Sequence, residues 1–371
     1  FNSTYRAVLH PTNGFLYAAA SSVHDLYAWD RYCRDSDIDN GRGEIILSTN
    51  KGISWQTLHA FGRPVVSLAL DPNNPNRLYA CMAHSASGGI YRTTNLHIGA
   101  ASVWTKLSFP PRTQGHPYNI VVLNDGTLVA SYSAHITNGD FSASSGVFIS
   151  TNNGAAWLDR SDTGMQYYTK DLIVDSHDLN QRIWYAGVWG EWGSSAGLGG
   201  LYRTTNRGLA WTRITTNLLA VESCTIHPSN PDEMLVTTES QGLWFTTNLA
   251  SATPRFFPDT HYPFRFPTRA FFNPFNTNEV WITSYGNGMR LGRISEPNPQ
   301  IAQPFLNTTG SFQCIILGAP GQRAVVQIST NLATWQAIAT NVFLDDSVLF
   351  NNSTVPQHSL LFYGAKILIN E

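Results

Sequence analysis

Carboxylates and aromatic rings are interleaved in two glycine-containing stretches of the sequence. The longer stretch, SSVHDLYAWDRYCRDSDIDNGRG, covers residues 21–43, and its candidate side chains are Asp25, Trp29, Asp30 and Tyr32. The shorter stretch, VWGEWGSSAGLGG, covers residues 188–200 and places Glu191 between Trp189 and Trp192. Rings beside carboxylates suit a ligand with an apolar face and polar edges, and a pyranose ring is such a ligand.

These residue types favour the binding or cleavage of sugars. Glycosidic cleavage uses two carboxyl groups about 5 to 10 Å apart, so we expect Asp25 or Asp30 to act with Asp171 or Glu191. The flanking indoles suit Glu191 to the role of a general acid. Alternatively, both indoles pack between sheets and Glu191 is solvated. The side chains expected to contact the ligand are Trp29, Tyr32, His116, Tyr118, Tyr168, Lys170, Trp189, Trp192 and Tyr285.

The acidic tail of the longer stretch is a candidate metal site. Asp35, Asp37 and Asp39 approach the D-x-D-x-D-G pattern of a calcium loop, but the glycine follows one residue late and Ile46 stands where a carboxylate is expected. The run therefore predicts either a Ca²⁺ site or a solvated acidic loop. The predicted sugar chemistry itself requires no cofactor.

The elements that must position these residues are indicated by an eight-residue repeat. Its complete copies are STNKGISW at residues 48–55, STNNGAAW at 150–157 and TTNRGLAW at 204–211, and degraded copies begin at Thr93 and Thr246. Asn and Gly tolerate left-handed backbone angles, and Ser, Thr and Asn side chains bond the backbone of their own turn. Each copy therefore predicts a hairpin turn between two strands.

This repeat resembles the Asp-box of bacterial neuraminidase-like proteins, with Asn where Asp is commoner. The resemblance implies an all-β, six- or seven-bladed β-propeller in which the boxes lie on the face opposite the binding loops. The chain also resembles propeller xyloglucan hydrolases through LDPNNPNRLYA and LYAWD, and sortilin-type propellers through the box. Ser21-Ser22-Val23 stands where those hydrolases carry a catalytic T-D-x-G-G stretch, and no sialidase F/Y-R-I-P start occurs.

The repeats and a proline-rich run, SEPNPQIAQPF, divide the chain into a propeller, residues 1–294, a linker, 295–305, and a C-terminal unit, 306–371. Blades are expected near residues 5–58, 63–107, 118–158, 168–214, 220–257 and 265–293. The C-terminal unit resembles the small β-sandwiches of bacterial secreted proteins. The alternative is a seventh blade, because Ser329, Asn331 and Trp335 mimic a box without its glycine. Another blade could also precede Phe1.

Composition limits the partners. Only 13% of residues are charged and the net charge is −2, which disfavours nucleic acid and anionic membranes. No apolar run approaches 18 residues, so no membrane insertion is expected. A start at Phe1 suggests a processed secreted protein or a piece of a longer chain. Cys33 and Cys81 are either disulfide-bonded or buried thiols, like Cys224 and Cys314.

The sequence therefore predicts a secreted or cell-surface carbohydrate-active propeller. Its first candidate function is that of a glycoside hydrolase acting on a polysaccharide. The alternatives are a non-catalytic module that binds a glycan or a protein, and a structural surface or assembly protein. Other domains of a longer chain are possible partners.

Overall fold

The computed structural model describes residues 3–293 except 24–25, 27–29 and 287, and residues 300–367 except 307–310, 319–321, 346 and 354–360. Asp25 and Trp29, two of the predicted site residues, lie outside the described residues. Up to residue 293 the chain forms consecutive antiparallel sheets, five of four strands and one of three. A two-stranded hairpin, β11 (Ile136–Thr137) and β12 (Asp140–Phe141), branches from the third sheet.

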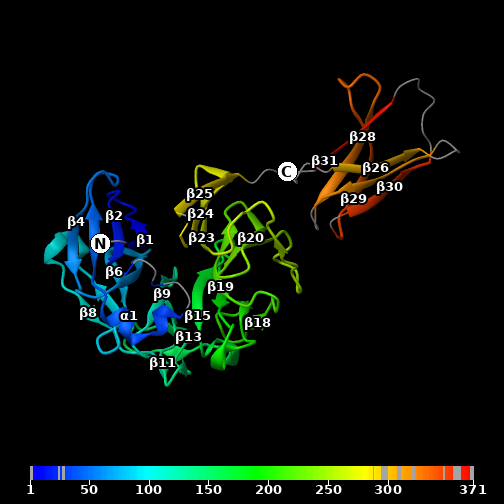
Figure 1. The fold of residues 1–371 in the computed structure, drawn as a ribbon. Helices are drawn as coiled ribbons and strands as arrows, with labels where there is room; N and C mark the ends of the chain where they lie inside the picture. The colour runs from blue at the N-terminus through cyan, green and yellow to red at the C-terminus, as the bar shows by residue number, and fades with distance from the viewer. Residues whose placement is uncertain are drawn as a thin grey trace.

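The six sheets follow one another in chain order around an arc (Figure 1). The first three contain β1 (Ser3–Leu9), β2 (Leu16–Ser21), β3 (Gly43–Ser48) and β4 (Gln56–Ala60); β5 (Val65–Asp71), β6 (Asn74–Met82), β7 (Gly89–Thr93) and β8 (Thr105–Lys106); and β9 (Pro117–Val122), β10 (Leu128–Tyr132), β13 (Gly146–Ser150) and β14 (Leu158–Asp159). The next three contain β15 (Thr169–Val174), β16 (Trp184–Val188), β17 (Gly200–Thr204) and β18 (Thr212–Arg213); β19 (Val221–His227), β20 (Asn230–Thr238), β21 (Leu243–Thr246) and β22 (Phe257–Pro258); and β23 (Pro267–Asn273), β24 (Asn276–Ser284) and β25 (Gly288–Arg293).

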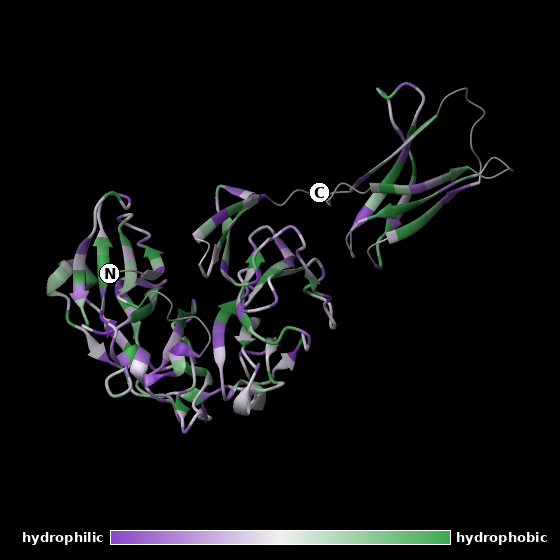
Figure 2. Cartoon of the chain, viewed as in Figure 1, coloured by the Kyte–Doolittle hydropathy of each residue, from purple (hydrophilic) through white to green (hydrophobic). Residues whose placement is uncertain are grey.

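Each sheet packs face to face on the next. The first strands β1, β5, β9, β15, β19 and β23 contact their successors in turn, so they lie innermost. Tyr17 and Ile45 of the first sheet, for example, are buried against Leu68 and Leu78 of the second. Burying one such side chain contributes about 1.5–3 kcal/mol. Hydrophobic residues concentrate on the strands (Figure 2). This is the packing of a β-propeller.

The repeat forms the predicted turn between the third and fourth strands of its sheets. In the copy after β13, the Gly154 N–H donates to Ser150 Oγ at 2.9 Å, and Asn152 Oδ1 accepts from the Ala156 N–H at 2.9 Å. Asn153 and Gly154 adopt φ values of 56° and 83°. The same bonds and angles recur in the copies after β3 and β17. The degraded copies keep the hydroxyl–Asn contact at Thr93 and Thr246, but their Asn Oδ1 atoms accept from more distant N–H groups, those of Val103 and Arg255.

The C-terminal residues form two three-stranded sheets outside the arc (Figure 1), and Arg255 contacts them with its Nη1 3.1 Å from Asp345 Oδ1. Their strands are β26 (Gln300–Leu306), β27 (Phe312–Leu317) and β30 (Ser347–Asn352), and β28 (Arg323–Ser329), β29 (Gln336–Val342) and β31 (Phe362–Ile367). Buried residues of both sheets, among them Cys314, Val326 and Phe350, form one hydrophobic cluster. β26 covers residues 300–305, which the sequence analysis assigned to the linker. The turn at Ser329 reproduces the first half of a box, because Ser329 Oγ donates to Asn331 Oδ1 at 3.2 Å.

Two further expectations concern cysteines and membranes. All four cysteines are buried free thiols, so Cys33 and Cys81 are not disulfide-bonded. Within the described ranges, no helix has the length and apolarity needed to cross a bilayer.

Candidate functional site

The loops that follow second strands and the loops that precede first strands form one continuous face. Backbone hydrogen bonds join them both between sheets and within one sheet. Between sheets, the His84 N–H donates to the carbonyl of Gly115 at 3.1 Å and the Gly190 N–H to that of Leu219 at 2.7 Å. Within single sheets, similar bonds join the loop before the first strand to the loop after the second. The Ser133 N–H donates to the carbonyl of His116, and the Trp189 N–H to that of Tyr168, both at 2.9 Å. The Glu239 N–H donates to the carbonyl of Ala220, also at 2.9 Å. The repeat turns join third to fourth strands, so they lie at the opposite ends of the strands, as the resemblance implied.

Most of the predicted ligand-contacting aromatics are buried beneath this face. Tyr32, Tyr118, Tyr168 and Trp189 are each at most 1% exposed. The Tyr32 hydroxyl donates to the carbonyl of Pro117, and the Tyr32 ring packs edge-on against Tyr118 at 5.0 Å. These four rings therefore fill the space between sheets. Tyr285, by contrast, is 49% exposed and lies against Phe266 with ring centroids 5.4 Å apart.

Glu191 is exposed, and its two neighbouring indoles do not enclose it. Trp189 is buried and donates from Nε1 to Glu239 Oε2 at 2.6 Å. Trp192 is half-buried and packs on Phe141 with centroids 4.5 Å apart. Glu191 Oε1 accepts from Ser240 Oγ at 2.6 Å. Of the two alternatives considered for this stretch, the structure has indoles packed between sheets beside a solvated carboxylate.

Two other predicted carboxylates are engaged in ion pairs. Asp30 is 6% exposed and bonds Arg34 at 2.5 Å. Asp171 is fully buried on β15, where its Oδ1 lies 3.3 Å from Arg6 of β1 and 3.5 Å from Arg269 of β23. Asp171 therefore connects the first and last sheets to the fourth at the centre of the arc. Its neighbours suit a structural role better than that of an acid or base.

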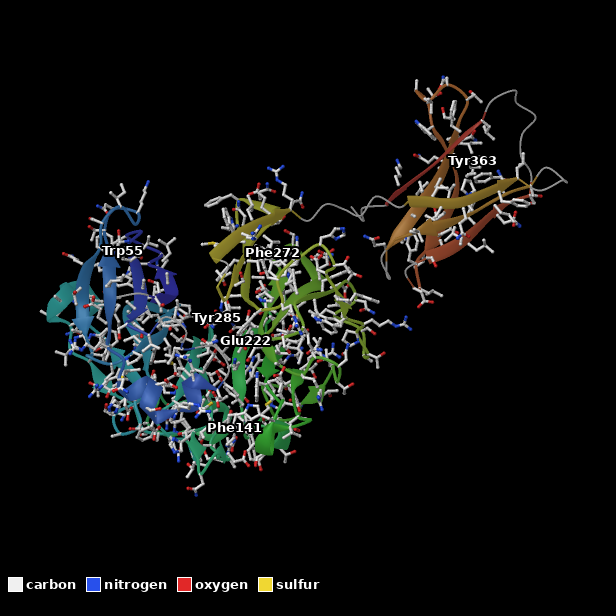
Figure 3. The ribbon with its side chains drawn as sticks, viewed as in Figure 1. Trp55, Phe141, Glu222, Phe272, Tyr285 and Tyr363 are labelled. Atoms are coloured by element: carbon white, nitrogen blue, oxygen red, sulfur yellow. The ribbon has the colours of Figure 1, made fainter. Side chains whose placement is uncertain are left out.

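Lys170 belongs to a buried charged cluster that the sequence analysis did not foresee. It is fully buried, its ammonium bonds Glu222 Oε1 and lies 3.6 Å from Glu239 Oε2, and these two glutamates are 2% and 6% exposed. Burial raises the pKa of Glu222 to about 8 although Lys170 opposes the shift, and it also raises the pKa of Glu239. Glu222 lies near the centre of the arc that the sheets form (Figure 3). The sequence signal for this cluster was the single acidic residue, Glu222, within the strand-like run VESCTI.

The acidic run does not form a calcium loop. Residues 35–39 form the short helix α1 (Asp35–Asp39), in which successive side chains point in different directions. Asp39 accepts from the Ser85 N–H at 2.8 Å, whereas Asp37 is half-buried. Asp35 instead contacts two histidines: its Oδ1 lies 2.9 Å from His135 Nδ1 and 3.5 Å from His116 Nε2. Burial lowers the pKa of His116, which favours the neutral imidazole.

A groove of about 360 Å³ lies between the first two sheets and was also missed. Its aromatic lining consists of His59, Phe61, Tyr91 and Trp104, all half-buried. His59 stacks on Trp104 with centroids 5.4 Å apart and an interplanar angle of 29°. Phe61 packs edge-on against Tyr91 at 5.0 Å and against Trp104 at 5.5 Å. The insertion that delays the tryptophan of the degraded repeat after Thr93 was the sequence signal for this groove.

Comparisons with known proteins establish similarity of fold. No protein-family model and no curated protein sequence matches this chain. It is similar to the extracellular domain of the putative hybrid two-component system BT3049 from B. thetaiotaomicron, at 13% identity over 93% of this chain and 41% of that chain, with a TM-score of 0.54. The corresponding domain of BT4673 from B. thetaiotaomicron matches at 12% identity over 91% of this chain and 45% of that chain, with a TM-score of 0.50. It is also similar to an ancestral GH74 enzyme, at 15% identity over 87% of this chain and 44% of that chain, with a TM-score of 0.52.

These similarities support the propeller fold expected from the repeats. The chain spans less than half the length of each of the three proteins. Because they include both an enzyme and domains of sensor systems, the fold leaves the activity open.

Proposed function

We propose that this chain is an extracellular carbohydrate-binding propeller module, and that the groove lined by His59, Phe61, Tyr91 and Trp104 holds the sugar. The observation that carries this proposal is the convergence of four half-buried rings from two sheets. Such rings offer flat apolar surface to the C–H face of a pyranose, while the imidazole of His59 and the hydroxyl of Ser87 supply polar contacts. A groove of about 360 Å³ is within the range of small-ligand sites.

Binding is tested by affinity electrophoresis of the full chain in gels containing xyloglucan or other soluble polysaccharides. We expect Trp104→Ala to weaken binding by roughly five- to tenfold, since loss of one stacking ring costs about 1–1.4 kcal/mol. Trp55→Ala is the matched control, because Trp55 belongs to a repeat turn at the opposite ends of the strands and is 41% exposed. Equal retardation of the two variants, or no retardation of the native chain by any polysaccharide, would contradict the proposal.

Glycoside hydrolysis is a second candidate, favoured by the proximity of two carboxylates on the loop face. Ser240, which bonds Glu191, directly follows Glu239, so these carboxylates of adjacent sheets are neighbours. Burial raises the pKa of Glu239, which suits it to donate a proton, while exposed Glu191 is suited to act as base or nucleophile.

This second candidate is tested by reducing-sugar release from any polysaccharide that the chain retains. We expect Glu191→Gln and Glu239→Gln each to lower the rate by at least about 100-fold, as for removal of a general acid or base, with retention unchanged. A rate that both variants preserve would exclude these residues. Retention without any sugar release would leave binding as the function.

A further inference from the structure

Three potential metal ligands converge on the loop face, well apart in sequence. Asp35, His116 and His135 each present one ligand atom, and these atoms lie within 4.8 Å of one another. They are the only such group of three among the described residues. The geometry is set by the inner strands of the third sheet, because His116 immediately precedes β9, His135 follows β10 and the two strands are paired. Asp35 reaches them from the first residue of α1.

His116 is the independent sign that this group has a ligand. Its imidazole is fully buried, yet neither ring nitrogen has a hydrogen-bond partner within the described part of the chain. Its Nε2 lies 3.5 Å from Asp35 Oδ1, which is longer than the distance of about 2.7–3.2 Å in an ordinary N–H···O hydrogen bond. Buried polar atoms without a partner are rare in folded proteins, because burial removes their bonds to water. A metal ion at Nε2 would supply the missing interaction.

The neighbouring His84 and Asp39 have other partners, and they lie 3.6 Å from each other, Nε2 to Oδ1. His84 Nδ1 accepts from the backbone N–H groups of Ala86 and Ser87 at 3.1 and 3.0 Å. Asp39 accepts from both the backbone N–H and the hydroxyl of Ser85, at 2.8 and 2.5 Å. The proposed ligand set is therefore limited to two imidazoles and one carboxylate.

We propose that Asp35, His116 and His135 bind a first-row divalent transition metal ion such as Zn²⁺. Two imidazoles and one carboxylate suit Zn²⁺ or Fe²⁺, whereas Ca²⁺ prefers oxygen ligands. Ligands about 2.0–2.2 Å from a tetrahedral ion lie roughly 3.4 Å apart. The observed separations from Asp35 are 2.9 and 3.5 Å, and all three ligand atoms lie within 4.8 Å of one another, so the two imidazoles must close around the ion as it replaces the proton shared by Asp35 and His135.

The site keeps one side open to solvent. The side chain of Asp35 is 39% exposed and that of His135 is 18% exposed, whereas His116 forms the floor. Three protein ligands leave a tetrahedral ion with a fourth position for water or an oxygen atom of a bound molecule. The ion would thus lie on the same face as the loops that carry Glu191 and Glu239.

The test uses the full chain, stripped with a chelator, and Zn²⁺ alone as the probe. Competition with a chromogenic zinc indicator measures the affinity, and Co²⁺ absorption reports the geometry. We expect one equivalent to bind with a dissociation constant of about 1 µM or lower, and Co²⁺ to give the intense visible bands of a tetrahedral site. His135→Ala and Asp35→Asn should each weaken binding by about 100-fold or more, since both remove a ligand.

Both variants alter half-buried side chains, so folding is checked by circular dichroism, and fully buried His116 is left intact. The control is His177→Ala, which removes a part-buried histidine in the β15–β16 connection, where Nε2 bonds the carbonyl of His227. We expect unchanged zinc affinity in that variant. No binding at 100 µM Zn²⁺, or binding that the two ligand variants leave within threefold of native, would overturn the proposal.

Discussion

Replacement of Lys170 by Met tests whether its ammonium compensates two buried carboxyl groups. Lys170 is fully buried, bonds Glu222 and lies 3.6 Å from Glu239. Met has similar length and no charge, so the substitution preserves volume and removes only the cation. Breaking a buried ion pair by removing one partner costs about 3–5 kcal/mol, because the remaining charge lacks compensation.

The cost depends on pH, and its sign follows from the carboxyls. Burial raises the pKa of Glu222 and Glu239, and Lys170 opposes both shifts. Without Lys170 both native-state values rise further above the unfolded value of about 4.3. A carboxyl group whose pKa is raised by folding makes its full contribution to stability below its unfolded-state pKa. That contribution is lost as the pH rises toward its folded-state pKa. Each further pKa unit costs about 1.4 kcal/mol of folding free energy. A rise of two to three pKa units, summed over the two carboxyl groups, therefore costs about 3–4 kcal/mol.

Thermal unfolding at pH 5 and pH 9, followed by tryptophan fluorescence, measures this cost. We expect Lys170→Met to unfold within about 2 °C of native at pH 5 and roughly 6–10 °C below native at pH 9. Adding Glu222→Gln should restore part of the loss at pH 9, because one buried charge is then absent. An equal loss at both pH values would refute the reasoning, since lost packing does not depend on carboxyl ionisation.

Four other substitutions probe the same framework. Asp171→Asn removes the anion shared by two arginines and should cost about 2–4 kcal/mol in urea unfolding; a loss below about 0.5 kcal/mol would contradict its bridging role. Glu222→Gln should flatten the pH dependence of the thermal midpoint between pH 5 and pH 8, because the raised pKa of about 8 makes native stability fall across that interval; an unchanged slope would assign it to other groups. Gly154→Ala should cost about 2–4 kcal/mol, because its added carbon collides with Leu107. Gly52→Ala has a similar φ with its nearest atoms 3.8 Å away and should cost only about 1–2 kcal/mol; equal losses would show that backbone strain alone acts.

Local patterns in the sequence predicted the strands and turns. The Ser/Thr-Thr-Asn-x-Gly turn depends on residues within five positions, such as Ser150 Oγ and the Gly154 N–H, so its conformation is encoded where it forms. Repetition of that turn then indicated antiparallel sheets in series and the face that carries the long loops. Most of the predicted aromatic residues belong to the loops of that face, but their side chains are buried under its surface. A sequence gives ring type and loop membership, while burial depends on how neighbouring sheets pack.

The sequence by itself determined the turns, the strand pattern and the loop face, because these follow from short-range hydrogen bonding and side-chain alternation. Only the tertiary structure decided which distant groups meet. Asp35 lies about 100 residues from His135, and Lys170 is separated from Glu222 by 52 residues. Such pairs form because each sheet packs on the next, which brings loops and inner strands together irrespective of their separation in the chain. The groove at Trp104 likewise depends on Phe61 and His59 of the preceding sheet, and the insertion after Thr93 marks only the Trp104 side of that contact.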